Sequence, residues 1–105
     1  MTKYIMHRLD RRYKMQRAGF ELMLVWSWPA SSNELSAGHP WSDCRRHQVV
    51  AERVFGLAYY EWANNRGNWK WERKYRNDRA GGRDIIEERV YIRSEKHLTL
   101  LQLAI

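Results

Sequence analysis

The chain has little cysteine and no long hydrophobic run. Cys44 is the one cysteine among 105 residues, so no disulfide can form within the chain, although small secreted domains usually depend on several. No stretch approaches the ~20 apolar residues of a membrane helix, and the N-terminal residues lack the apolar core of a signal peptide. We therefore expect a cytoplasmic protein with one domain, residues 1–105, and no membrane contact.

The motifs of common enzyme classes are also missing. The sequence has no glycine-rich phosphate loop, no Gly-x-Ser-x-Gly and no His-Glu-x-x-His. Glu72 and Lys74 match half of a metal-dependent nuclease pattern, but that chemistry needs an acid on a preceding strand, where Glu21 is the one candidate. Such short matches arise by chance in charged strands, so we expect no enzyme, no cofactor and no bound metal.

Cys44 and His47 form a second weak pattern, because they lie three residues apart on a predicted helix. A thiol in the first helical turn beside Arg45 and Arg46 should have a lowered pKa, and His47 could take its proton. With His39 the set offers three metal ligands, which is a weak signal. The alternative is a cysteine buried on the apolar side of the helix, which we favour because free cysteine is among the most buried residue types.

Basic residues are the clearest excess. Lys and Arg number 19 against 12 Asp and Glu, which gives a formal net charge of +7. Such a chain is drawn to polyanions, a group that includes nucleic acids, anionic membranes and acidic protein surfaces. Charge alone does not choose among them.

Three segments have a helical pattern. Residues 2–18 carry an apolar residue at every fourth position: Ile5, Leu9 and Tyr13. Residues 42–66 carry a stripe from Cys44 to Trp62, with Ser42 as the N-cap and Asn65-Arg66-Gly67 as the stop. Gly56 falls inside this helix, at a cost that close packing against a strand would explain. Residues 95–104 follow Ser94, which can cap a last helix.

Three other segments have the two-residue period of strands: residues 20–28, 69–76 and 85–93. One face of the first strand carries Phe20, Leu22, Leu24, Trp26 and Trp28. The long helix returns the chain so that the first two strands run the same way, and the third can then lie between them, antiparallel to both. The order α-β-α-β-β-α thus predicts an α+β fold, with a three-stranded, mainly antiparallel sheet and helices on one face.

The second strand, NWKWERKYR, alternates aromatic and charged residues. Trp69, Trp71 and Tyr75 share one face, and Lys70, Lys74 and Arg76 share the other. We favour burial of the aromatic face under the helices, because large exposed apolar patches are rare. The alternative is an exposed platform that stacks on bases of single-stranded nucleic acid. Burial would leave a basic open face that holds phosphates.

We expect binding through basic side chains on three elements. They are Arg8, Arg11 and Arg12 on the first helix, Arg45, Arg46 and Arg53 on the long helix, and Lys70, Lys74 and Arg76 on the second strand. Trp41, expected to be exposed, would anchor a protein partner. The loop at residues 31–39 would add a further contact, because it is longer than most connections.

The C-terminal segment VYIRSEKHLTLLQLAI, a strand followed by Ser-Glu and a short apolar helix, resembles the tails of small accessory proteins encoded by bacteriophages. The resemblance implies stoichiometric binding to a host machine, such as a defence nuclease or a polymerase, in an anti-CRISPR-like role. Inhibitors of this kind that mimic DNA are acidic, and this basic chain departs from that pattern. It would instead touch nucleic acid within a complex, or an acidic protein groove.

Our first functional hypothesis is therefore a non-enzymatic inhibitor or accessory factor of a nucleic-acid machine in the cytoplasm of a bacterial host. The second is direct, sequence-tolerant binding of nucleic acid by the free protein. The third is a small enzyme that uses Cys44 and His47, or Glu72 and Lys74. Either a monomer or a homodimer built on exposed tryptophans is compatible with each.

Overall fold

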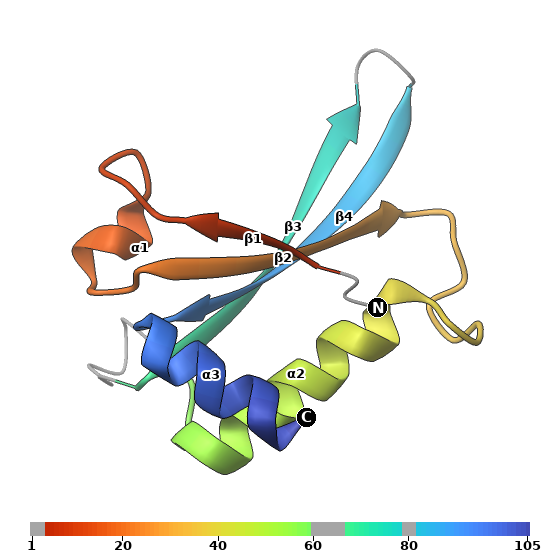
Figure 1. Cartoon of the computed structure of the whole chain (residues 1–105). Helices are drawn as coiled ribbons and strands as arrows, with labels where there is room; N and C mark the ends of the chain where they lie inside the picture. The colour runs from red at the N-terminus through yellow and green to blue at the C-terminus, as the bar shows by residue number, and fades with distance from the viewer. Residues whose placement is uncertain (1–3, 60–66, 79–81) are drawn as a thin grey trace.

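Over residues 4–59, 67–78 and 82–105, which are the residues described, the computed structural model is an α+β fold with a four-stranded sheet and three helices (Figure 1). In chain order the elements are β1 (Ile5–Arg8), α1 (Lys14–Arg17), β2 (Leu22–Pro29), α2 (Pro40–Phe55), β3 (Trp69–Asp78), β4 (Arg83–Ile92) and α3 (Glu95–Ala104). The expectation of a three-stranded sheet is therefore wrong. The strand order is β1-β2-β4-β3 and every neighbouring pair is antiparallel.

The additional strand comes from the segment that was expected to be a helix, residues 2–18. Its first part is β1, which pairs Ile5 with Val25 and Arg8 with Leu22. A helix follows, but it has only four residues. The edge of β2 offers a full row of hydrogen-bond partners, and pairing with it satisfies the backbone of this short segment better than an isolated helix would.

The three expected strands lie in the order β2-β4-β3, so that β4 separates β2 from β3 and is antiparallel to both. This part of the expected arrangement agrees with the structure. Helices α2 and α3 pack together on one face of the sheet (Figure 1). The main core lies between them and the sheet, and its fully buried side chains include Leu22, Leu24, Trp26, Val90 and Leu101.

A second, smaller cluster lies on the opposite face of the sheet. Met15, Phe20, Met23 and Tyr91 are buried there, because α1 and its flanking turns fold over this end of the sheet. Phe20 was expected to share a face with Leu22, but it precedes the regular part of β2 and packs in this second cluster.

Helix α2 differs from its predicted bounds at both ends. His39 rather than Ser42 is the N-cap, since its Nδ1 accepts a hydrogen bond of 3.0 Å from the backbone N–H of Trp41. Gly56 ends the helix with φ +85° and ψ −157°, a conformation that essentially only glycine adopts. The predicted helix continued to residue 66, but residues 57–59 are not helical, and residues 60–66 lie outside the described residues. Within those residues, no helix combines the length and apolar character needed to cross a membrane.

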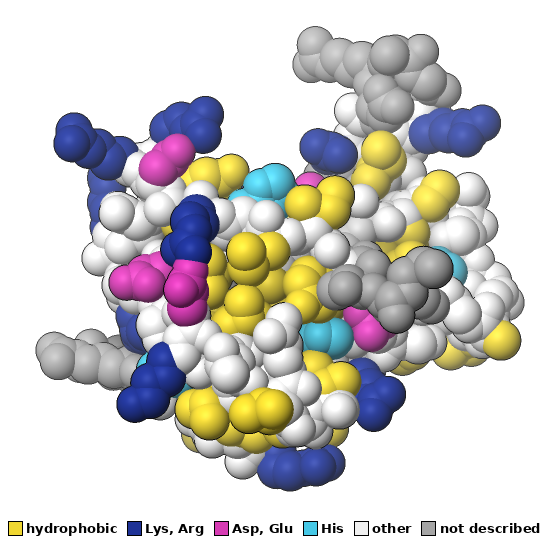
Figure 2. All heavy atoms as spheres, in the orientation of Figure 1, with side chains coloured by type: hydrophobic (Ala, Val, Ile, Leu, Met, Phe, Trp, Pro, Cys, Tyr) yellow, Lys and Arg dark blue, Asp and Glu magenta, His cyan; other side chains and the backbone are white. Residues whose placement is uncertain are grey.

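The four-residue strand β1 is tied to α3 at both of its ends. Arg8 forms an ion pair with Glu95, and Gln102 donates a hydrogen bond of 3.0 Å to the hydroxyl of Tyr4. Figure 2 shows hydrophobic side chains gathered over the space between β1 and α3, with Lys and Arg side chains spread around the rim of this face. The N-terminal and C-terminal elements thus lie side by side.

Candidate functional site

The outer side of α2 carries three of the predicted basic residues together. Arg46 and Arg53 are seven residues apart, which is about two helical turns, and Arg45 adjoins Arg46, so the three share one side of the helix. They surround a shallow hollow of about 440 Å³ whose other lining residues are Ser42, Val49, Val50 and Ala104. We call these three arginines the α2 arginine stripe. The opposite side of α2 is buried against the sheet through Cys44, His47, Gln48 and Ala51.

No carboxylate neutralises the stripe among the described residues. Arg45, Arg46 and Arg53 are exposed, and none of their side chains takes part in an ion pair or hydrogen bond within the parts of the chain that the structure describes. An arginine presents five fixed N–H donors, a geometry that suits phosphate and carboxylate oxygens. Three guanidinium groups on one helix are therefore available to bind an anionic partner.

The basic residues predicted near the N-terminus are placed differently. Arg8 lies on β1 and is paired with Glu95. Arg12 lies in the turn after β1, 2.9 Å from Asp10, and this hydrogen-bonded contact lowers the pKa of the Asp10 carboxyl. Arg11 is exposed in the same turn. These three residues do not form a common surface on a helix, because the predicted helix is not there.

The basic residues of β3 lie on the open face of the sheet, where two of the three have partners among the described residues. Lys74 Nζ is 3.9 Å from Glu72 Oε1, and Lys70 Nζ lies 5.6 Å from the centre of the Tyr59 ring. Arg76 is exposed and lies opposite Ile85 on β4. The predicted phosphate-binding face of β3 therefore has fewer unpaired cations than the α2 arginine stripe.

The same face carries a polar network that the sequence did not indicate. Tyr91 donates a hydrogen bond to Glu72, and Arg89 donates to Glu87 over 2.6 Å and to the Tyr91 hydroxyl over 3.3 Å. Burial and the bond to Glu72 raise the pKa of Tyr91. This network fixes β3 to β4 and leaves Glu72 engaged.

Trp41 does not fit the expected exposed anchor. It is only partly exposed, and it packs against the main core beside the start of α2. The loop between β2 and α2 is instead engaged through Glu34, which accepts a hydrogen bond of 3.1 Å from Trp28 Nε1. Nη1 of Arg73 lies 3.2 Å from Glu34 Oε1 as well.

Cys44 is fully buried, which agrees with the favoured interpretation of this residue. Burial and a hydrogen bond to Glu88 raise the pKa of the thiol, whereas the nucleophile hypothesis required a lowered pKa. His47 is turned elsewhere, with Nδ1 2.7 Å from the carbonyl oxygen of Asp43. Arg45 and Arg46 do not lower the thiol pKa because they lie on the solvent side of α2.

Glu88 joins Cys44 to a buried polar cluster that sequence patterns missed. Its carboxylate is 4% exposed, and it accepts hydrogen bonds from Cys44 Sγ (3.0 Å), Gln48 Nε2 (3.4 Å) and Arg73 Nε (2.9 Å). Burial by itself lowers the pKa of Arg73, but hydrogen bonds to Tyr75 and Glu88 and the nearby carboxylates outweigh it, so that the pKa is raised. The cluster is internally satisfied and has a structural role.

The metal-dependent nuclease pattern finds no support in the geometry. Glu72 accepts the hydrogen bond from Tyr91, and Glu21 is exposed just before β2. Across the described residues, no group of three or more His, Cys, Asp or Glu side chains is placed to hold a metal ion.

The aromatic face of β3 is only partly buried. Trp69 is 3% exposed and donates from Nε1 to the carbonyl oxygen of Gly56 over 2.8 Å. Trp71 is 40% exposed and Tyr75 is 69% exposed. Burial of all three residues under the helices was therefore a wrong expectation beyond Trp69, because the β3–β4 hairpin extends past the helical layer (Figure 1).

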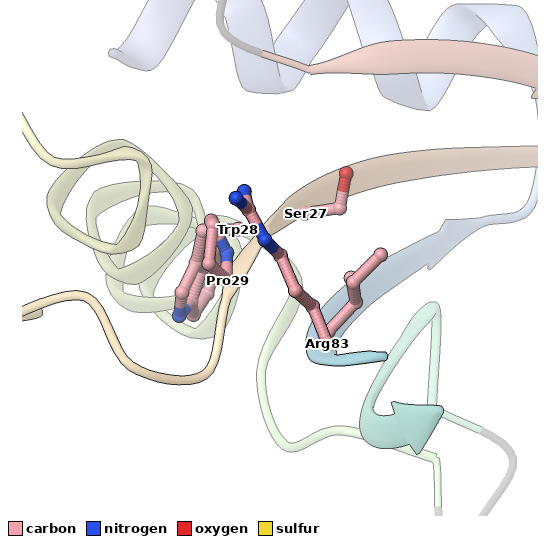
Figure 3. A pocket seen from close by; sticks show the side chains of 5 residues that line it. Ser27, Trp28, Pro29 and Arg83 are labelled. Atoms are coloured by element: carbon pink, nitrogen blue, oxygen red, sulfur yellow. The ribbon is translucent and has the colours of Figure 1, made fainter. Parts of the chain in front are cut away.

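A smaller hollow of about 270 Å³ lies where β2 ends and β4 begins. Figure 3 shows the long side chain of Arg83 reaching toward Trp28 and Pro29, with Ser27 farther along β2. Within the described residues neither Arg83 nor Arg76, which lies opposite Ile85, takes part in an ion pair.

The arrangement defines a class of site: a rigid helix with free arginines, accompanied by exposed aromatic residues on an edge strand. No protein-family model, no curated protein and no solved structure matches this chain. The functional conclusion therefore depends on the geometry of these surfaces.

Proposed function

We propose that the protein is a non-enzymatic binding protein that holds phosphate groups of a nucleic acid, free or within a nucleoprotein complex, on the α2 arginine stripe. One observation supports this proposal. Three arginines line a hollow on one side of α2, and none of them has an acidic partner among the described residues. The formal net charge of +7 favours the same class of partner.

The dimensions of the stripe suit a phosphate backbone. Arg45 and Arg53 are eight residues apart, which corresponds to about 12 Å along a helix. Duplex DNA carries one charge per ~1.7 Å of its axis, so a length of about 12 Å presents roughly seven phosphates. Contacts of this type position a protein on nucleic acid without reading its sequence.

The biological role that we propose is stoichiometric action on a nucleic-acid machine in the host cytoplasm, as the resemblance to phage accessory proteins implies. In that role the stripe would hold nucleic acid already bound to the machine. The same stripe would also bind free nucleic acid, more weakly and with little sequence preference.

The test is a fluorescence-polarisation titration of labelled duplex and single-stranded oligonucleotides at about 50 and 200 mM salt. The variant Arg45→Gln/Arg46→Gln/Arg53→Gln removes the stripe. Its matched control is Arg11→Gln/Arg17→Gln/Lys96→Gln, which removes three exposed cations from other surfaces. Each set lowers the formal net charge from +7 by three to +4.

We expect the stripe variant to lose affinity strongly and the control variant to lose little. Three arginine–phosphate contacts contribute about 2.7 to the slope of log K against log salt, so the stripe should account for about a 40-fold loss of affinity between the two salt concentrations. Equal losses in both variants would show binding by net charge alone. Absence of binding at the lower salt concentration would refute the proposed function.

A further inference from the structure

We propose that β3 carries a second contact site, at which Trp71 and Tyr75 stack on unpaired bases of single-stranded nucleic acid. The inference rests on the proposed function and deepens it, because it names unpaired strands as the preferred form of the partner. It concerns a surface separate from the α2 arginine stripe.

The two aromatic side chains point to the same side of the sheet. Trp71 lies opposite Val90 and Tyr75 lies opposite Ile86. Val90 and Ile86 belong to the main core, so both rings lie on the face of the sheet that α2 and α3 cover nearer the other end of the strands. The helices reach Trp69, which bonds to the carbonyl oxygen of Gly56, but the later residues of β3 extend past them (Figure 1). Trp71 and Tyr75 thus keep 40% and 69% of their surface exposed.

The residue between them makes the site rigid. Arg73 is held by Glu88 over 2.9 Å and by Glu34 over 3.2 Å, and its guanidinium lies 5.6 Å from the centre of the Trp28 ring. Arg73 therefore links β3 to the core strand β4 and to the loop before α2. An aromatic pair on a fixed strand loses little conformational entropy when a base stacks on it.

The basic character of the chain favours a nucleic acid as the partner of the pair. The formal net charge of +7 attracts polyanions. Arg73 lies between the two rings on the same face of β3, while Lys74 and Arg76 adjoin Tyr75 in sequence and point to the other face of this edge strand. Aromatic stacking combined with attraction of phosphates by basic residues is the pattern of single-strand binding.

The spacing selects an unpaired strand. Four residues of a β-strand span about 13 Å, whereas successive bases in one strand of a duplex are ~3.4 Å apart. Bases stacked on Trp71 and Tyr75 are therefore not immediate neighbours, and both must expose a flat face to the protein. Bases inside a duplex are already stacked on each other and cannot do so.

The experiment compares an oligothymidylate of about 15 nucleotides with a duplex of the same length in the polarisation assay. The variants are Trp71→Ala and Tyr75→Ala, with Trp71→Phe and Tyr75→Phe to retain a ring. Leu103→Ala is the control, because Leu103 is an exposed apolar residue on α3. Circular dichroism checks that each variant is folded.

We expect each alanine variant to bind the single strand about 5- to 150-fold more weakly, while its affinity for duplex is unchanged. The phenylalanine variants should retain most of the single-strand affinity. Equal weakening for both nucleic acids, or no weakening for either, would overturn the inference. If duplex and single strand bind equally and only the loss of the α2 arginine stripe matters, the proposed function stands and this inference fails. If the wild-type protein binds neither, both fail.

Discussion

The Sγ atom of Cys44 donates a hydrogen bond of 3.0 Å to Oε2 of Glu88, and this contact joins α2 to the middle of β4 inside the main core. Gln48 and Arg73 bond to the same carboxylate. No buried side-chain nitrogen or oxygen of the described residues is left without a partner. A buried carboxylate is costly unless its bonds are complete, so this cluster fixes how the long helix sits on the sheet.

The thiol of Cys44 should be unreactive in the folded protein. It is fully buried and its pKa is raised by burial and by Glu88, so little thiolate is available to react. We expect iodoacetamide to alkylate the native protein at least about 100-fold more slowly than the protein in guanidinium, because reaction requires opening of the core. Similar rates in the two conditions would mean that the thiol is accessible.

The stability of the fold should decline at alkaline pH because of the same residue. The unfolded chain releases the Cys44 proton near the ordinary pKa of 9.0, while the folded chain retains it to higher pH. The stabilisation is complete below the unfolded pKa and is lost as pH rises toward the folded one. Above about pH 9 the free energy of unfolding should fall by up to about 1.4 kcal/mol per pH unit. Denaturant titrations of wild type and Cys44→Ala should differ in this slope, and parallel slopes would argue against it.

Arg73 should contribute much more to the free energy of unfolding than an exposed arginine does. The substitution Arg73→Ala leaves the Glu88 carboxylate, 4% exposed, without its cationic partner. We expect a loss of about 3 kcal/mol in the free energy of unfolding. The control Arg8→Ala breaks the exposed ion pair with Glu95 and should cost at most about 1 kcal/mol.

The double variant Arg73→Met/Glu88→Leu separates ion pairing from packing. Replacing both charges by apolar groups removes the unpaired carboxylate, so most of the lost stability should return. Urea unfolding of Arg73→Met, Glu88→Leu and the double variant gives the coupling energy between the two residues. A double variant as unstable as the sum of the singles would show that the two charges are not coupled.

Gly56→Ala should destabilise the protein through backbone strain alone. Its φ of +85° and ψ of −157° are almost confined to glycine, and no atom lies within 4 Å of the position that a Cβ would take. We expect a loss of about 1–3 kcal/mol, measured as a lower midpoint of thermal unfolding. A neutral substitution would show that the end of α2 can adopt another conformation.

Much of the regular structure follows from local sequence patterns. The two-residue period found β2, β3 and β4 to within about two residues, which is the usual uncertainty of element ends. Ser94 caps α3, where its side chain accepts from the backbone of His97 as a cap residue should. These elements have a long enough repeat for the period to be unambiguous.

The errors occurred where tertiary contacts overrule the local pattern. Ile5 fits a helical stripe as well as a strand, and only the edge of β2 decides between them. Gly56 was interpreted as an interior residue because apolar residues at helical spacing continue beyond it in the sequence, at Ala58 and Trp62. In the structure Gly56 has a positive φ, and this ends the helix. The sequence alone does not show which glycines adopt a positive φ.

The candidate site was predictable in part. The grouping of Arg45, Arg46 and Arg53 follows from helical spacing and needs no tertiary information. The sequence does not show which cations lack an acidic partner. Arg8 pairs with Glu95 and Arg73 pairs with Glu88, and both pairs join distant parts of the chain. The exposure of Trp71 depends likewise on how far the helices extend over the sheet.

The side chain of Arg93 has a consequence for how the molecule opens. Its guanidinium donates to the carbonyl oxygens of Ala18 and Gly67 and lies 4.0 Å from the centre of the Phe20 ring. It thereby connects the turn after α1, the approach to β3 and the start of α3. We expect these parts of the chain to lose their amide protection against hydrogen exchange together, as one cooperative unit, rather than to fray separately.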